Sequence, residues 1–249
     1  FYCSTEADMT STRRALLLAA IFAFVPAPSA WADPCLPPVS TESGMARGFR
    51  DDDTNTCAWL GIPYAEPPAG DLRWAAPRKA SPWEGVLEAR NYGNKCMQKG
   101  AITEAINPSP EEGYSEDCLF LNIWRPARSG KFPVMVWIHG GGYQSGTGNS
   151  RLVQGDRLAE SGGVVVVTIN YRVNVFGFLA HPSLREEDPN NSAGNYGSLD
   201  QVAALRWVRD NIEGFGGDPR NVTIFGQSAG CRSVCSLVAT PLAKGLFHR

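Results

Sequence analysis

Hydrophobic residues in the second half of the chain occur in unbroken runs as well as in spaced patterns. Two such runs, residues 133–138 and 163–170, are rich in Val and Ile. Strands buried on both faces have this pattern, because helices cover each face of a parallel sheet. The two runs therefore predict strands inside a parallel sheet. Shorter apolar segments at 56–62, 119–124 and 222–225 predict further strands.

A helical period follows the second run. Ser198 is followed three residues later by Gln201, which is a capping-box pattern. Apolar residues then recur at helical spacing as far as Ile212, and glycines follow. A second helix is predicted over 229–238, after the strand at 222–225 and a tight turn. Strand, helix, strand, turn and helix indicate an α/β fold, with a central, mostly parallel sheet covered by helices. No repeat or linker divides residues 33–249, so one domain is expected there.

The first 32 residues have the layout of an export signal. Residues 1–8 precede Met9, and Arg13 and Arg14 precede an apolar run at 15–25. Such a run is too short to span a bilayer, and the sequence Ala30-Trp-Ala32 fits a cleavage site. We therefore expect a signal peptide cleaved after Ala32, and a secreted or periplasmic protein. A buried core helix is the alternative, and the sequence leaves the export pathway open.

Composition excludes some classes of partner. The net charge is −2 and 43% of residues are hydrophobic, so neither nucleic acid nor stable membrane insertion is expected. No Cys/His set has zinc spacing, and no metal or organic cofactor is expected. Six cysteines follow residue 32, an even number that favours disulfides in an oxidising compartment. Cys231 and Cys235 share one helix face, where buried free thiols are favoured over a disulfide between them.

Chemistry is suggested by Gly226-x-Ser228-x-Gly230, which lies between a predicted strand and a predicted helix. A sharp turn there would lift the serine hydroxyl above the sheet edge, and small flanking residues would let strand and helix approach closely. The helix N-terminus would favour developing negative charge. Taken alone, the pattern also fits a glycine-rich turn with an incidental serine.

A second motif, residues 139–142 (HGGG), directly follows the predicted strand at 133–138. Glycines let backbone N–H groups point at a carbonyl oxygen without intervening side chains, and such a loop pairs with a nucleophile turn. Each well-aimed donor contributes roughly 2.7–4 kcal/mol to lowering the barrier of acyl transfer. Together the two motifs predict a serine nucleophile with an oxyanion site.

The chain resembles the type-B carboxylesterase/lipase family, the cholinesterase-like α/β hydrolases. The resemblance implies the α/β-hydrolase fold, Ser228 as the acylated nucleophile, and an oxyanion hole formed by the N–H groups of Gly141, Gly142 and Ala229. The matching motifs occur in order along almost the whole of residues 33–249: 60–65 (LGIPYA), 115–122 (SEDCLFLN), 136–142 (VWIHGGG), 170–173 (NYRV), 215–219 (FGGDP) and 225–230 (FGQSAG).

The same resemblance implies covalent and ionic links. It pairs Cys96 with Cys118, and on weaker grounds Cys35 with Cys57. A disulfide-closed loop of this length is worth about 3 kcal/mol in the chain-entropy model. Two ion pairs are implied as buried, although exposed pairs worth little are the alternative. These pairs are Arg73 with Glu116 and Arg172 with Asp200.

Two departures from the family bear on substrate. The family usually has Glu before the serine, whereas this chain has Gln227, and the segment between Cys96 and Cys118 contains no Trp. A quaternary ammonium group needs an aromatic face. Choline esters are therefore not expected, and small, neutral, moderately apolar esters are.

The catalytic base has no candidate in the sequence. In α/β hydrolases the triad runs Ser, then Asp or Glu, then His, yet no Asp or Glu follows Ser228. We therefore expect an N-terminal fragment that lacks the acid, the histidine and later strands, and that is inactive and unstable alone. Two other functions stay open: a catalytically silent binding or adhesion homologue, and a thioesterase or amidase of the same fold.

Overall fold

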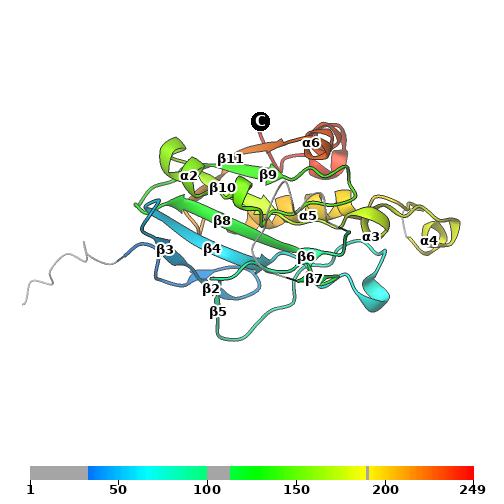
Figure 1. Ribbon diagram of the computed structural model, residues 1–249, viewed down its shortest axis with the longest axis horizontal. Helices are drawn as coiled ribbons and strands as arrows, with labels where there is room; N and C mark the ends of the chain where they lie inside the picture. The colour runs from blue at the N-terminus through cyan, green and yellow to red at the C-terminus, as the bar shows by residue number, and fades with distance from the viewer. Residues whose placement is uncertain (1–32, 100–112, 189–190) are drawn as a thin grey trace, which may run out of the picture. The chain divides into compact units, whose positions relative to one another are not determined.

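A six-stranded sheet forms the centre of the fold (Figure 1). The computed structural model describes residues 33–99, 113–188 and 191–249, so the predicted signal peptide lies outside the described residues. Residues Asp33–Arg249 group into one compact unit. In spatial order the strands are β11 (Gly217–Gly226), β9 (Phe132–Ile138), β10 (Val165–Ile169), β8 (Phe120–Pro126), β4 (Thr56–Pro63) and β3 (Phe49–Asp51).

Pairing within this sheet is mixed. Strands β11, β9 and β10 are parallel to one another, whereas β8, β4 and β3 join by antiparallel pairing. The α/β class is confirmed, but parallel pairing is confined to the half that contains β9, β10 and β11. The difference follows from the connections. A short turn joins β3 to β4, which an antiparallel pair allows, while helical crossovers join the parallel strands.

Helices cover both faces of the sheet. Helix α2 (Asp156–Gly162) packs on one face, where Ala159 joins Trp124 and Val166. Helix α5 (Tyr196–Asn211) covers the opposite face, and α6 (Ala229–Ala239) packs on β11 and β9. Helix α5 begins two residues before the predicted cap, with Asn195 at its N-cap and no side-chain capping bond. Buried Tyr196 extends the apolar face to this earlier start.

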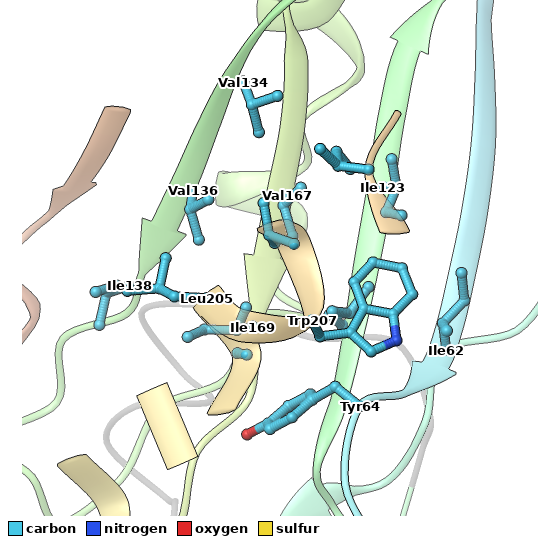
Figure 2. Packing of buried hydrophobic residues seen from close by; sticks show 14 of the residues in the cluster. Ile62, Tyr64, Ile123, Val134, Val136, Ile138, Val167, Ile169, Leu205 and Trp207 are labelled. Carbon is cyan, nitrogen blue, oxygen red and sulfur yellow. The ribbon is translucent and has the colours of Figure 1, made fainter. Parts of the chain in front are cut away.

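The main core lies between the sheet and α5 (Figure 2). Alternate residues of the central strands point to this side, so that Val134, Val136 and Val167 face Leu205 and Trp207 of the helix. These side chains are fully or almost fully buried. The core therefore holds β9 rigidly up to Ile138, the last residue before the predicted oxyanion loop.

The remaining strands and α-helices are short. They are β1 (Val39–Ser40), β2 (Met45–Arg47) and β5 (Val86–Glu88), which form one small sheet, β6 (Lys95–Cys96) and β7 (Tyr114–Ser115), which form another, and helices α3 (Asn174–Phe178) and α4 (Pro182–Glu187). The helices of the described segments include none long and apolar enough to cross a membrane.

Both cysteine pairings suggested by the sequence are disulfides in the structure. Cys35–Cys57 links the start of the described chain to β4, and Cys96–Cys118 links β6 to a residue two positions before β8. Two disulfides fit a secreted protein or one of an oxidising lumen.

The other two cysteines correct a prediction. Cys231 and Cys235 are free, but they are exposed rather than buried. The buried face of α6 contains Ala229, Ser233 and Leu237, which recur every four residues. Both cysteines lie two positions away from this series, so the period of the helix turns them outward.

The two expected ion pairs differ in environment. Arg172 and Asp200 are buried, with side chains 3% and 0% exposed, and the guanidinium binds both carboxylate oxygens, at 2.8 and 2.7 Å. Arg73 and Glu116 also form a two-point pair, but these side chains are 37% and 22% exposed. The expectation of burial thus holds for the first pair only.

Candidate active site

Two loops meet at one edge of the sheet because β9 and β11 are adjacent and parallel. Ile138, the last residue of β9, lies opposite Gly226, the last residue of β11. The segment 139–142 therefore leaves the sheet beside Ser228, although about 90 residues separate the two in sequence. Ligand sites in α/β proteins lie at this carboxyl edge of the strands.

Ser228 lies in a strained turn. Its backbone has φ 57° and ψ −119°, a conformation that non-glycine residues rarely adopt. The glycines on either side allow the turn, because a Cβ on Gly226 would lie 2.6 Å from the Gly230 carbonyl carbon. A Cβ on Gly230 would lie 2.0 Å from the Ile138 oxygen. The turn leaves the Ser228 side chain exposed at the start of α6.

The loop after β9 packs directly on this turn. A Cβ on Gly140 would lie 3.1 Å from the Ser228 Cβ and 2.6 Å from the Gln227 oxygen. Gly141 and Gly142 have φ values of 115° and 64°, which favour glycine. Only glycines therefore let the backbone of this loop approach the serine so closely.

Several donors at this edge are uncommitted. Among the described residues, the N–H groups of Gly141, Gly142 and Ala229 donate to no acceptor. The Gly141 carbonyl instead accepts from the N–H groups of Gln144 and Ser145, at 3.0 and 3.1 Å. Free backbone N–H groups can stabilise an oxygen that gains negative charge. The Ala229 N–H also lies at the positive end of α6, which adds to this effect.

His139 supports the loop rather than acting as a base. Its ring stacks on Tyr171 with centroids 4.1 Å apart, and its Nδ1 lies 2.8 Å from the Gly140 oxygen. The Tyr171 hydroxyl donates to the His139 carbonyl at 2.8 Å. Burial lowers the pKa of His139 to about 4, so the ring is neutral at ordinary pH.

The structure supplies no proton acceptor for Ser228 in the segments it describes. The Ser228 hydroxyl has no hydrogen-bonding partner there. His181 accepts from the Ser183 N–H at the start of α4, and His248 accepts from the Val222 N–H. Nor do the described residues contain a group of three or more His, Cys, Asp or Glu that could hold a metal ion.

A supporting network beneath the loop was missed by sequence reasoning. The Gln98 carboxamide binds both backbone groups of Gly146, and Asn174 donates to the Met97 carbonyl at 2.6 Å. The Asn174 N–H also donates to the Tyr143 carbonyl, at 2.6 Å. These contacts join segments far apart in sequence through ordinary polar residues, and no local pattern indicates them.

Comparison with known proteins places these features in a family. The carboxylesterase family matches residues 36–249. The fumonisin B1 esterase of Sphingopyxis macrogoltabida is 46% identical over 84% of this chain and 38% of its own length. The para-nitrobenzyl esterase of Bacillus subtilis is 46% identical over 85% of this chain and 42% of its own length.

Solved structures agree with this match. A para-nitrobenzyl esterase structure aligns with a TM-score of 0.79 and 45% identity, over 85% of this chain and 42% of that one. A carboxylesterase from Geobacillus stearothermophilus aligns with a TM-score of 0.74 and 47% identity, over 85% and 42% of the two chains. The chain thus spans about two fifths of the length of these relatives. It belongs to the carboxylesterase family and has the α/β-hydrolase fold.

Proposed function

We propose that the full-length protein containing this chain is a serine carboxylic ester hydrolase that works through an acyl-enzyme. The observation that carries the proposal is the strained turn of Ser228 at the start of α6, where Gly140 packs against the serine. Backbone strain of this kind costs about 1–3 kcal/mol and persists at functional sites. Here it leaves Ser228 exposed next to the uncommitted Ala229 N–H and against the loop that contains Gly141 and Gly142.

The proposed reaction has two halves. Ser228 Oγ attacks the ester carbonyl carbon while a general base takes its proton, and the carbonyl oxygen becomes an oxyanion. The N–H groups of Gly141, Gly142 and Ala229 stabilise this oxyanion. The C–O bond to the alcohol then breaks, and the base returns the proton to the leaving alcohol. Water, activated by the same base, releases the acid and restores Ser228.

The base and its acid partner are proposed to come from the part of the relatives' length that this chain does not span. The proposal rests on two observations. The chain covers 38–42% of the relatives, and the Ser228 hydroxyl has no partner among the described residues. A serine without a base is a weak nucleophile, so residues 33–249 alone are proposed to be inactive.

Small neutral esters are the proposed substrates. Gln227 is exposed next to Ser228 and places no negative charge there, which disfavours selection of cationic alcohols. One relative is named a fumonisin B1 esterase and another a para-nitrobenzyl esterase, so the relatives' names do not indicate one particular ester. The two disulfides support a secreted or periplasmic location.

Turnover by the full-length protein and its Ser228→Ala variant on matched ester, thioester and amide substrates tests the proposal. Ester turnover should be fastest and should fall by about 10⁶-fold in the variant. Faster turnover of the thioester or the amide would reassign the enzyme to that class. Absence of turnover on all three in the unmodified protein would favour a binding homologue.

A further inference from the structure

The Gln98 side chain is held between two backbone segments. Its amide nitrogen donates to the carbonyls of Cys96 and Gly146, at 3.0 and 2.9 Å, and its oxygen accepts from the Gly146 N–H at 2.7 Å. Both donors and an acceptor of the carboxamide are therefore used. The half-buried Gln98 side chain thus bonds both backbone groups of Gly146, as the backbone of a paired β-strand would.

Gly146 in turn packs on the oxyanion loop. It is buried with φ 117°, and a Cβ there would lie 2.2 Å from the Gly140 oxygen and 2.3 Å from His139 Nδ1. The backbone of Gly146 thus lies against the pair that His139 Nδ1 and the Gly140 carbonyl form at 2.8 Å. Movement of Gly146 would change the space available to that carbonyl.

The Gly140 carbonyl and the Gly141 N–H belong to one planar peptide group and point in opposite directions. Whatever fixes the carbonyl therefore fixes the direction of the N–H, which is one of the three proposed oxyanion donors. Transition-state stabilisation depends on this direction, because a misplacement of about 1 Å costs about 100-fold in rate.

We propose that Gln98 is a positioning residue for the oxyanion hole: it holds Gly146 against the Gly140 peptide and so aims the Gly141 N–H. The inference rests on the proposed function of Ser228. Cys96 of the disulfide Cys96–Cys118 lies two residues before Gln98, so the disulfide anchors the backbone of Gln98. Asn174 fixes the intervening Met97 carbonyl. The backbone immediately before Gln98 is thus fixed at two points.

Gln98→Glu in the full-length protein tests this role by pH. The introduced carboxyl, when protonated, can donate to the Gly146 carbonyl and accept from its N–H, as the amide does. The carboxylate cannot donate, and it faces two carbonyl oxygens. At neutral pH we expect kcat to fall about 10- to 100-fold with KM within about twofold. The ratio of variant to wild-type kcat should rise about tenfold as pH falls and the carboxyl is protonated.

A control and a second variant separate the effect of added charge from the loss of the Gln98 hydrogen bonds. Gln154→Glu adds the same charge at an exposed glutamine that binds Tyr92, and it should leave kcat unchanged at every pH. Gln98→Ala removes the hydrogen bonds without adding a charge, so its lowered kcat should show no recovery at low pH. It also serves as the test if Gln98→Glu does not fold.

The outcomes distinguish this inference from the proposed function. If an organophosphate labels Ser228 and esters are hydrolysed, but both Gln98 variants match the wild-type kcat, the positioning role is wrong. A kcat ratio for Gln98→Glu that is low and independent of pH would also contradict it. Failure of the wild-type protein to be labelled would instead overturn the ester-hydrolase proposal itself.

Discussion

At the scale of single residues, the site depends on glycines that leave no room for a side chain. Gly230 has an ordinary backbone conformation, so only contact limits it, and a Cβ there would meet the Ile138 oxygen at 2.0 Å. That oxygen belongs to the last residue of β9, directly before the oxyanion loop. A clash here must displace either the start of α6 or the end of β9.

We therefore expect Gly230→Ala to lower the free energy of unfolding by about 3 kcal/mol and to reduce esterase activity. Gly113→Ala is the matched control, because its nearest contact, the Asn94 oxygen, lies at an ordinary 3.7 Å. Urea unfolding of the full-length variants checks the difference. Equal stabilities of the two variants would show that the close approach at Gly230 is not limiting.

His139 gives a prediction for pH. Its folded-state pKa of about 4 lies below the ordinary 6.5, because burial disfavours the charged ring. The neutral ring therefore contributes stability that is fully present above pH 6.5 and is lost as pH falls toward 4. The shift corresponds to about 3 kcal/mol.

We expect His139→Asn to remove this part of the acid destabilisation, since asparagine does not titrate. The slope of unfolding free energy against pH, measured in urea between pH 7 and pH 4.5, should be shallower in the variant than in the wild-type protein. Equal slopes would mean that His139 does not stay neutral in the folded state.

At the scale of elements, a buried ion pair ties the loop after β10 to α5. Asp200 accepts from the backbone N–H of Arg172 at 3.0 Å as well as from its guanidinium. We expect Asp200→Asn to cost about 3–5 kcal/mol, because it leaves a buried charge unpaired. Glu116→Gln, which breaks the more exposed pair with Arg73, should cost much less. Thermal unfolding of the two variants checks this order.

The sequence predicts elements well where burial leaves a strong pattern. The run at 133–138 is a strand as predicted, although only one of its faces is fully buried, and Pro133 on the other face is exposed. Strand β11 is found, but the sequence underestimates its length. Residues 218–221 are polar or proline, so the apolar pattern misses the first part of that strand. The exposure of Cys231 and Cys235 on α6 is not predicted, because Cys counts as an apolar residue in a helical pattern. Which side of the helix is buried depends instead on how α6 packs on the sheet.

For the candidate site, the sequence indicates the two motifs but not the contacts that support them. The two glycine motifs are local, and the parallel pairing of β9 with β11 is what brings them together. The contact between Gln98 and Gly146 has no local signal, because it joins two segments separated by 48 positions. Such support depends on tertiary geometry that a single sequence does not display.

At the scale of the whole molecule, two disulfides of equal sequence separation, 22 positions, have different surroundings. Each is worth about 3 kcal/mol in the chain-entropy model. The bond Cys35–Cys57 lies far along the chain from the motifs of the site, whereas Cys96–Cys118 anchors Gln98. Removing either should therefore lower stability by a similar amount, but only the second should also slow catalysis.

We expect the double variant Cys35→Ser/Cys57→Ser to keep the wild-type kcat and Cys96→Ser/Cys118→Ser to lose about tenfold. Both should unfold at lower temperature than the wild-type protein. Assays are made well below the lower unfolding temperature, so that loss of folded protein does not contribute. Equal kcat in the two double variants would contradict the link between the second disulfide and the oxyanion hole.

Ser228 is proposed to be an activated nucleophile in the full-length protein. The most direct measurement is reaction with a serine-directed organophosphate, followed by peptide mass spectrometry. We predict one phosphorylated site, at Ser228, formed stoichiometrically and with loss of esterase activity, and no labelling of Ser228→Ala. A folded protein that hydrolyses esters but remains unlabelled at Ser228, or is labelled at another residue, would show that Ser228 is not the nucleophile.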